Sequence, residues 1–360
     1  VISRDIEKIN QEKISFSFSI LDEAQHIKNH RTQRAKSVKE IKADTRLALT
    51  GTPLENSVAE LWSIFDYLMP GYLGNYNYFY KNFYTPISKN NDRKKMKELK
   101  ERVAPFILRR RKEEVLSELP EKIINIQPVN MTQLQEDSYQ MVLDEVKNNV
   151  EAVIAERGFE RSHINVLTAL TKLRQICNHP SLVLGNEGLK HNSGKLDTLE
   201  ELVSDAVSGG HKIIIFSQFV KMLRLIKNRL VLNNIKFEYL DGSTRNRMER
   251  VNNFNNNEDI DAFLISLKAG GVGLNLTSAD IVIHVDPWWN PMVERQASDR
   301  AHRLGQENRV IVYKLITKGT VEEKMLKLQK KKQDVFDNII ENNVNPIRAI
   351  TWEDIQELLS

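Results

Sequence analysis

Two adjacent carboxylates near the amino end of the chain are its first candidates for chemistry. Residues 16–21 are predicted to form a strand that delivers Asp22 and Glu23 at its carboxyl end, where open α/β sheets place their ligands. Asp22 could hold Mg²⁺ through the water shell of the ion, and Glu23 could polarise the water that attacks a γ-phosphoryl group. One alternative stays open: the acids could begin a helix, where they suit the positive end of its dipole. A metal site at His26 and His30 is disfavoured, because no H-E-x-x-H motif is present and Lys28 and Arg31 would bring positive charge close to the ion.

A second candidate lies towards the other end of the chain. Asn290 offers an N-cap with Pro291 at the first helical position, so a helix is predicted to follow. Gln296, Arg300 and Arg303 stand at i, i+4 and i+7, which predicts that they share one face of this helix. Such a face could present arginine to a phosphate in the transition state of phosphoryl transfer. The alternative is that the arginines pair with acidic neighbours on a solvated helix surface.

A glycine loop and a hydroxyl-rich turn follow two of the apolar runs. Residues 263–265 are typical of a buried strand, and the loop after them holds three glycines within residues 270–273, which lets the backbone approach another group closely. Residues 46–49 are predicted to be a strand that ends in Thr50-Gly51-Thr52-Pro53. The hydroxyls of that turn could relay the state of one site to another, or cap a helix.

The remaining pattern predicts an α/β fold with parallel sheets. Further strands are expected at residues 123–129, 212–217, 236–240, 261–265, 281–285 and 309–316, and helices at 134–184 (a pair), 196–208, 219–232, 244–255 and 320–338, with a capping box at Thr351 before a short last helix. Ser193-Gly194-Lys195 could be mistaken for a phosphate loop. Its glycine spacing is wrong, and Leu196 stands where a Ser or Thr must reach Mg²⁺.

Composition limits the class of protein. At 360 residues two or more domains are expected, and 41% hydrophobic and 28% charged residues are typical of a soluble globular protein. Cys177 is the only cysteine, so a disulfide framework or thiolate zinc site cannot form. No signal peptide or membrane-length apolar run occurs, which predicts an intracellular, soluble protein. The sequence opens at Val1 without an initiating Met, and we expect it to be part of a longer protein.

Charge and aromatic residues are unevenly distributed. The net charge is only +4, but residues 89–112 hold eleven Lys or Arg against three acids. This segment could follow a phosphate backbone or be a solvated helix face. Residues 61–84 are rich in aromatic side chains, whose spacing favours the core of a helical protrusion over base stacking.

Several segments resemble, in order, the motifs of one family. Residues 21–29 (LDEAQHIKN) and 49–56 (LTGTPLEN) resemble motifs II and III of the Swi/Snf-type ATPases, the DNA translocases that include chromatin remodellers. The resemblance continues through the inter-lobe connector (105–110 and 119–122), the helical insertion (174–180), motif IV and its neighbour (215–219 and 240–244), and motifs V and VI (263–306). The phrases DPWWNP (286–291) and RAHRLGQ (300–306) are specific to this family within the helicase-like superfamily.

The resemblance implies two RecA-like lobes, the first one truncated, that bind ATP and Mg²⁺ between them. Asp22 (with Mg²⁺) and Glu23 would lie on one side of the nucleotide, and Gln296, Arg300 and Arg303 on the other. It further implies that Gly271 and Gly273 line the cleft. The residues on or near DNA would be Ser217, Gln218, Ser266, Lys268, Asn275 and Trp289. Those that couple the ATP and DNA sites would be Gln25, His26, Thr50 and Thr52.

By the same resemblance six segments are expected. They are the carboxyl-terminal part of lobe 1 (1–60), its helical protrusion (61–104), the connector (105–130), the helical insertion of lobe 2 (131–190), lobe 2 (191–318), and a brace helix with the tail (319–360).

One departure bears on activity: no G-x-x-x-x-G-K-[ST] motif occurs in these residues. We therefore expect the full-length protein to be a DNA-stimulated ATPase, and this piece alone to hydrolyse little ATP.

The function predicted is ATP-dependent translocation on double-stranded DNA, by a monomer, that remodels or displaces a DNA-bound complex such as a nucleosome or RNA polymerase. No membrane partner is expected, and the location would be cytoplasmic and nucleoid-associated, or nuclear in a eukaryote. A strand-separating helicase and an ATP-independent DNA-binding scaffold are the alternatives.

Overall fold

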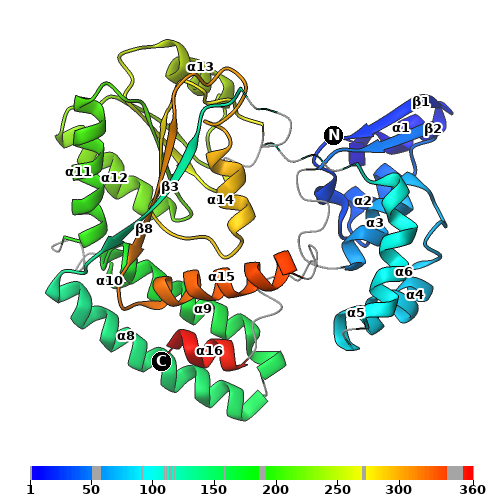
Figure 1. Cartoon of the computed structure of the whole chain (residues 1–360), viewed down its shortest axis with the longest axis horizontal. Coiled ribbons are helices and arrows are strands. Elements are labelled where there is room, and N and C mark those ends of the chain that lie inside the picture. Colours follow the sequence, from blue (N-terminus) through cyan, green and yellow to red (C-terminus); the bar gives the residue numbers. More distant parts are fainter. Residues whose placement is uncertain are drawn as a thin grey trace. The chain divides into compact units, whose positions relative to one another are not determined.

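The computed structural model describes residues 2–50, 58–90, 92–108, 110, 112, 116, 118–157, 159–185, 192–269, 273–338 and 352–359. The chain divides into two compact units (Figure 1). Unit 1 comprises Val1–Val115 and Gln333–Ala349, and unit 2 comprises Leu116–Lys332 and Ile350–Ser360. Each unit is described by itself.

A pair of parallel strands organises the first part of unit 1. After α1 (Ile2–Gln11), strand β1 (Phe16–Leu21) leads through a 3-10 turn, η1 (Ala24–Ile27), and α2 (Gln33–Lys39) to β2 (Ala43–Ala48). The predicted strands are therefore present, and β2 begins three residues before the predicted run. Because the strands are parallel neighbours, their carboxyl ends lie side by side, with Leu21 opposite Ala48.

The two faces of this small sheet differ. On one face, the Ser19 hydroxyl lies 2.7 Å from the hydroxyl of Tyr67, which is buried with Ile27, Ala35 and Val38. The alternate residues point away from this cluster and are exposed: Phe16, Phe18, Ile20, Leu47 and Leu49. Phe18 is 67% exposed and Ile20 58%, so an apolar sheet face is in contact with solvent.

A helical protrusion completes the described part of unit 1. It contains α3 (Val58–Leu68), α4 (Tyr76–Phe79), the π-helical turn η2 (Tyr80–Tyr84), α5 (Thr85–Asn90), α6 (Arg93–Val103) and the 3-10 turn η3 (Ala104–Phe106). Trp62, Phe65, Phe79 and Phe83 form its buried core, which confirms the prediction made for these aromatic residues. Other aromatic side chains of the segment are exposed, namely Tyr72, Tyr78 and Tyr80.

The predicted basic segment is only partly a free positive surface. On α6, Glu98 forms ion pairs with Lys95 and Arg102, each at 2.8 Å. Both cations also lie over the Phe83 ring, at 5.5 Å and 5.3 Å from its centroid. Part of the charge is thus held against the protrusion itself, as expected of a solvated helix face.

Unit 2 is built on a six-stranded parallel sheet with the order β3-β8-β7-β4-β6-β5. The strands are β3 (Lys122–Val129), β4 (Ile213–Ser217), β5 (Phe237–Leu240), β6 (Ala262–Ser266), β7 (Ile281–His284) and β8 (Val310–Thr317). The helices between them are α11 (Gly194–Ser208), α12 (Val220–Leu232), α13 (Arg247–Asn256) and α14 (Pro291–Ser298). The predicted α/β fold class is confirmed, because alternating strands and helices form a parallel sheet covered by helices.

Alternate residues of the central strands point into two separate cores. Ile213 and Ile215 of β4 pack with residues of α11 and α12, whereas Ile214 and Phe216 pack with residues of α13 and with Ala297 of α14. All five residues of β4 are buried. This explains why the strand reads as a continuous apolar run rather than an alternating one.

Further helices surround the sheet. The helical insertion consists of α8 (Gln133–Arg157), α9 (Phe159–Asn178) and the short α10 (Ser181–Leu184), as predicted for a pair of long helices. The last helices are α15 (Val321–Asn338) and α16 (Trp352–Leu359), while the predicted cap Thr351 lies outside the described residues. None of the helices in the described ranges is long and apolar enough to cross a bilayer.

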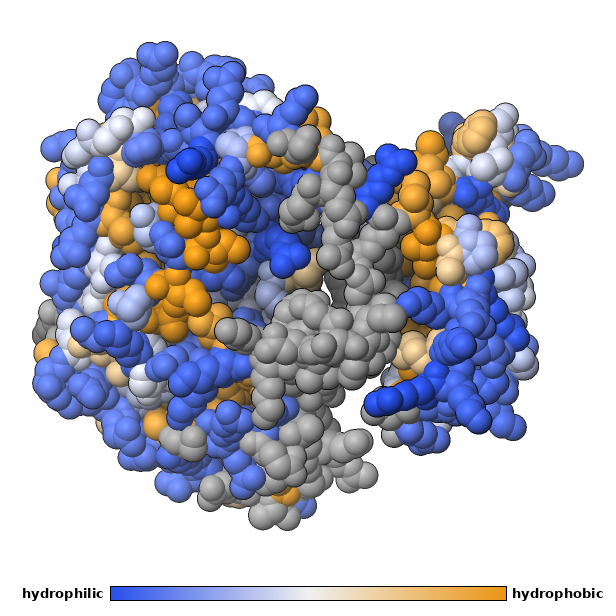
Figure 2. Space-filling view, viewed as in Figure 1, coloured by the Kyte–Doolittle hydropathy of each residue, from blue (hydrophilic) through white to orange (hydrophobic). Residues whose placement is uncertain are grey.

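Edge strand β3 carries an apolar patch. Ile124 and Ile126 are 56% and 55% exposed, and hydrophobic surface lies over this strand in Figure 2. Pro128 cannot donate a backbone hydrogen bond, which makes the edge a poorer template for another strand.

Candidate functional site

The turn after β1 gives the predicted carboxylates a distinct geometry. Asp22 is exposed and accepts a hydrogen bond from the Glu23 amide at 2.9 Å through one carboxylate oxygen. Glu23 adopts the left-handed conformation, with φ 52° and ψ 51°, which is uncommon for a residue with a side chain. This turn sends the chain away from the strand direction and leaves both carboxylates at the sheet edge.

A hydrogen-bonded chain joins this turn to the neighbouring strand. The Gln25 amide nitrogen donates to the Glu23 carboxylate at 2.5 Å, and the Thr50 hydroxyl donates to the Gln25 amide oxygen at 2.7 Å. The main chain reinforces the contact, since the Ala24 amide donates to the Leu49 carbonyl at 2.9 Å. Gln25 therefore connects the end of β1 to the end of β2. Of the other predicted coupling residues, His26 is exposed and Thr52 lies outside the described residues.

His30 takes part in an aromatic stack. Its ring lies 4.0 Å from the Tyr76 ring and 5.5 Å from the Trp62 ring. Within the described ranges, no three His, Cys, Asp or Glu side chains are grouped so that they could hold a metal ion.

In unit 2 the predicted arginine helix is shorter than expected. Helix α14 ends at Ser298, and Arg300 and Arg303 lie in the turns that follow it. The amides of Arg300 and Ala301 bond three residues back, to Ala297 and Ser298, instead of four. The prediction that Gln296, Arg300 and Arg303 share one helix face is therefore wrong, because the chain tightens into consecutive turns before Gly305 (φ 96°).

These turns are nevertheless fixed in place. Arg300 is only 5% exposed, and its carbonyl accepts a hydrogen bond from the Leu276 amide at 3.0 Å, which ties it to the end of the glycine loop. Arg303 is half-buried, and its Nε donates to the Asp299 carbonyl at 3.1 Å. Asp299 in turn forms an ion pair with Lys122 at 2.7 Å.

Strand ends β4, β6 and β7 converge at the carboxyl edge of the larger sheet. Ser217 pairs in register with Ser266, and the Ser217 carbonyl accepts from the Leu267 amide at 3.0 Å. Asp286, which follows β7, accepts hydrogen bonds from the Ser217 hydroxyl and from the Gln218 amide. This edge is the place where a doubly wound sheet binds ligands.

The residues predicted near DNA differ in exposure. Ser217, Ser266 and Trp289 are buried, Gln218 is half-buried, and Lys268 and Asn275 are exposed. Among the described residues, the side-chain nitrogen of Gln218 has no hydrogen-bond partner. Gly273 has a φ of 45°, a conformation that suits glycine, and Gly271 lies outside the described residues.

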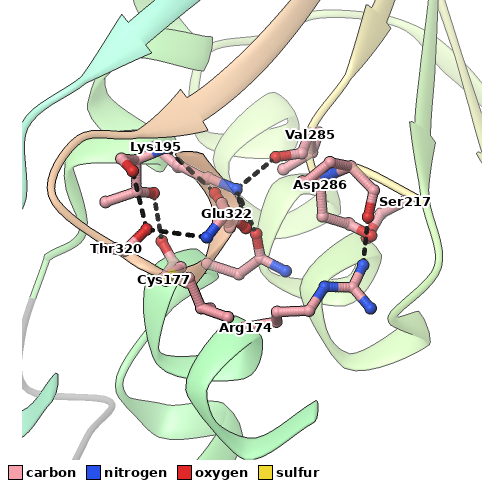
Figure 3. Close-up of polar contacts among 12 residues, drawn as sticks. Arg174, Cys177, Lys195, Ser217, Val285, Asp286, Thr320 and Glu322 are labelled. Atoms are coloured by element: carbon pink, nitrogen blue, oxygen red, sulfur yellow. Dashed lines mark hydrogen bonds and ion pairs between the residues drawn. The ribbon is translucent and has the colours of Figure 1, made fainter. Parts of the chain in front are cut away.

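Beneath this edge lies a group of buried charges that the motifs did not predict (Figure 3). The Lys195 ammonium donates to Asn178, to the Val285 carbonyl and to Glu322, at 2.9, 2.7 and 2.7 Å. Both Lys195 and Glu322 have fully buried side chains. Lys195 is thus a structural residue at the start of α11, whose N-cap is Ser193. Its contacts agree with the prediction that this sequence is not a phosphate loop.

The second half of the group is Arg174 and Asp286, which are 1% and 2% exposed. Burial raises the pKa of the Asp286 carboxyl, and the positive charges of Arg174 and Lys195 oppose that shift. Burial likewise raises the pKa of the Cys177 thiol, so this cysteine packs as a small apolar side chain. The only signal for Arg174 in the sequence was its place in the segment RQICNHP (174–180).

Comparison with known protein families decides the classification. Residues 1–182 match the SNF2-related domain, and residues 194–305 match the helicase conserved C-terminal domain. The chain belongs to the SNF2-related family. The resemblance inferred from the motifs is confirmed, and the fold is that of a helicase-like ATPase with two RecA-like lobes.

Relatives of this SNF2-related chain are considerably longer. An uncharacterized ATP-dependent helicase of Mycoplasma pneumoniae is 36% identical over 360 residues, which cover 99% of this chain and 34% of that protein. The TATA-binding protein-associated factor MOT1 of Saccharomyces cerevisiae is 36% identical over 413 residues, which cover 99% of this chain and 22% of that protein. The chain spans about a third or less of the length of these relatives.

A solved structure agrees with the assignment to the SNF2-related family. The SWI2/SNF2 ATPase core of Sulfolobus solfataricus in complex with double-stranded DNA is 38% identical, with a TM-score of 0.57. The match covers 99% of this chain and 75% of that one.

Proposed function

We propose that this chain is the greater part of the motor of a DNA-dependent ATPase that moves along double-stranded DNA and remodels or displaces a protein complex bound there. The observation that carries the proposal is the hydrogen-bonded chain from Glu23 through Gln25 to Thr50. It links a carboxylate suited to activating water with the end of the neighbouring strand. Membership of the SNF2-related family, whose members include proteins described as ATP-dependent helicases, supports the use of ATP.

Asp22 and Glu23 would have separate roles. Asp22 has an exposed carboxylate with one oxygen engaged by the Glu23 amide, and this hard oxygen donor fits a Mg²⁺ ion held through water. Glu23 would orient the attacking water, and its bond to Gln25 would fix the carboxylate direction. When bound, Mg²⁺ would neutralise negative charge on the phosphates. Through Gln25, a change at Thr50 could alter the position of Glu23, which is the coupling role we assign to these residues and, with them, to His26 and Thr52.

Gln296, Arg300 and Arg303 would serve the same ATP molecule in the full-length protein. Arg300 is anchored through its backbone to Leu276, and Arg303 through its side chain to the Asp299 carbonyl. The Arg303 guanidinium, held in this way, needs little reorganisation to stabilise the charge on a transferring phosphoryl group. Gly271 and Gly273 would let the backbone of their loop approach the nucleotide closely.

DNA would be gripped at the carboxyl edge of the larger sheet. Lys268 and Asn275 offer exposed polar side chains. The side-chain nitrogen of Gln218 is buried and has no hydrogen-bond partner among the described residues, so a rotation of this side chain would present a further donor. We propose that the buried residues Ser217, Ser266 and Trp289 shape this surface from beneath. Double-stranded DNA as the substrate is supported by its presence with the Sulfolobus solfataricus core.

We retain the predicted division of labour along the chain. Residues 1–60 and 191–318 would be the two catalytic parts, 61–104 the protrusion, 105–130 the connector, 131–190 the helical insertion and 319–360 a brace and tail. The displaced complex would be a protein bound to duplex DNA. The similarity to a TATA-binding protein-associated factor supports such a target, and a nucleosome or RNA polymerase is equally compatible with the chain itself.

The test is ATP hydrolysis by the full-length protein with and without duplex DNA, together with displacement of a third strand from a DNA triplex. Duplex DNA should raise turnover, and Glu23→Gln and Arg303→Ala should each lower it by about 10²-fold or more. Matched controls are Asp259→Asn and Arg309→Ala, which neutralise exposed charges elsewhere and should leave turnover unchanged. Turnover indifferent to DNA would refute the translocase, whereas unwinding of a forked duplex without triplex displacement would favour the helicase alternative.

A further inference from the structure

Arg174 of α9 is enclosed where segments from three parts of unit 2 meet. Its side chain is 1% exposed, and a terminal guanidinium nitrogen donates to the Pro287 carbonyl. The guanidinium carbon also lies 5.8 Å from the centroid of the Phe219 ring and 5.6 Å from that of Trp289. One planar cation thus contacts the segment after β4 and the segment after β7 at the same time.

Asp286 joins the same two segments from the other side. Its carboxylate accepts from the Ser217 hydroxyl through one oxygen and from the Gln218 amide, at 3.2 Å, through the other. Asp286 and Arg174 are both almost fully buried, and the charge of each favours the ionised form of the other. The pair therefore fixes where the two strand ends lie relative to each other.

The backbone around Trp289 is held by further residues. The Gln329 amide nitrogen of α15 donates to the carbonyls of Trp288 and Trp289. The Trp288 amide donates to the Glu294 carboxylate at 2.5 Å. Within this arrangement, Arg174 is the contact that comes from the helical insertion.

We propose that Arg174, through its contacts with Pro287, Phe219 and Trp289 and together with Asp286, is a positioning residue that holds Ser217, Gln218 and Trp289 in the arrangement that binds duplex DNA. The inference rests on the proposed function. It gives the helical insertion a specific role, since α9 sets the geometry of the DNA-binding edge from within the core.

The buried ion pair of Lys195 and Glu322 supplies a matched control. Lys195 and Glu322 are as deeply buried as Arg174 and Asp286, and they lie in the same group of charges. Besides bonding to each other, their side chains form hydrogen bonds with Asn178, the Val285 carbonyl and the Thr317 amide, not with the side chains proposed near DNA. Removing this pair therefore also takes two charges out of the core, but it leaves in place the hydrogen bond of Ser217 to Asp286 and the contact of Arg174 with the Trp289 ring.

The experiment compares two double variants of the full-length protein, Arg174→Met/Asp286→Asn and Lys195→Met/Glu322→Gln. Each removes one buried cation and one buried anion, so the core stays neutral. The readouts are the duplex concentration that gives half-maximal ATPase stimulation and the turnover at saturating duplex. For the first variant we expect the half-maximal concentration to rise about tenfold, as for the loss of one good contact, with turnover at saturation nearly unchanged. For the second we expect wild-type values of both.

A second measurement tests the positioning role of Arg174 independently of ATP hydrolysis. Amide hydrogen exchange should be faster at Gln218 and Trp288 in Arg174→Met/Asp286→Asn than in the wild type, and unchanged there in Lys195→Met/Glu322→Gln. Arg174→Lys keeps the charge without the planar fork, and should give an intermediate half-maximal concentration.

The outcomes separate the two proposals. A wild-type protein without DNA-stimulated turnover refutes the proposed function. A DNA-stimulated wild type, with equal half-maximal concentrations and equal exchange in both double variants, refutes the positioning role of Arg174.

Discussion

His284 should make the stability of unit 2 depend on pH, and replacing it with phenylalanine should remove that dependence. The imidazole is 1% exposed and stacks on the Phe216 ring, with centroids 5.3 Å apart. Its Nε2 lies 2.8 Å from the Ser298 hydroxyl, and its Nδ1 has no hydrogen-bond partner among the described residues. Phenylalanine has a similar shape and keeps the stacking, but it cannot bind a proton.

The expected magnitude follows from the shift in pKa. Burial, with the positive charges of Lys314 and Lys122, lowers the pKa of His284 from 6.5 to about 3. The folded state thus favours the neutral ring, whereas the unfolded chain takes up a proton as the pH falls below 6.5. The resulting stabilisation is fully present above pH 6.5 and is lost progressively towards pH 3. Between pH 7.5 and pH 5 the loss amounts to about 2 kcal/mol.

Urea unfolding at several pH values between 5 and 7.5 measures this loss. In a Trp62→Phe background the remaining tryptophans, Trp288, Trp289 and Trp352, all belong to unit 2, so fluorescence follows that unit. At pH 7.5, His284→Phe should be less stable by about 1 kcal/mol because it loses the hydrogen bond to Ser298. By pH 5 the variant should equal or exceed the parent.

Ser298→Ala provides the control, because it removes the same hydrogen bond and keeps the titrating ring. Its unfolding free energy should fall between pH 7.5 and pH 5 as steeply as that of the parent. Parallel curves for the parent and His284→Phe over this interval would show that His284 does not titrate as the structure implies.

Two further predictions concern packing and surface. Lys195→Met leaves the Glu322 carboxylate buried without its cation and should lower the unfolding free energy by about 3–5 kcal/mol, whereas adding Glu322→Gln should restore most of the loss in the same urea assay. Phe18→Thr combined with Ile20→Thr should reduce self-association of the 360-residue chain in sedimentation velocity, because both side chains belong to the exposed sheet face, while Ile164→Thr, a single exposed side chain elsewhere, should not.

The central strands β4, β6 and β7 were well predicted because each is a short, fully buried apolar run, whereas β2 (ADTRLA) mixes polar and apolar residues and begins three residues before its predicted run. The buried strand β4 lies within one residue of its predicted bounds, and β8 is offset by one residue from its own. In a parallel sheet covered on both faces, burial on both sides imposes a continuous apolar pattern that is visible without the structure. The contact between Gln25 and Thr50 was not predicted, because the pairing of β1 with β2 is seen only in the structure; the resemblance assigned both residues to coupling without placing them in contact.

The arginine segment shows where periodicity is insufficient. The spacing of Gln296, Arg300 and Arg303 fits a helix, but spacing does not report where a helix ends. Here bonds to the third preceding residue replace helical bonds after Ser298, and the Arg300 carbonyl instead accepts from the Leu276 amide. A tertiary contact of this kind overrides local propensity.

The buried charges were missed for a different reason. Lys195 bonds to Glu322, which lies 127 residues away in the sequence, and Arg174 donates to the carbonyl of Pro287, which lies 113 residues away. A motif search reads a lysine after glycine as a phosphate ligand or as solvent-exposed, since lysine is almost never fully buried unless it is paired. The pairing depends on the fold, so no local sequence pattern predicts it.

The Lys195–Glu322 ion pair and the buried charges of Arg174 and Asp286 should differ in what they do for the protein. A buried ion pair is seldom more stable than a well-packed apolar pair of similar volume, because desolvation offsets the attraction. Lys195 has three hydrogen bonds to fixed acceptors and can be replaced together with Glu322 if packing is kept. Arg174 instead combines a charge, a donor and a plane that lies over two rings, and no apolar side chain reproduces all three. Stability should therefore tolerate loss of either complete pair, whereas DNA affinity should depend on Arg174 and Asp286.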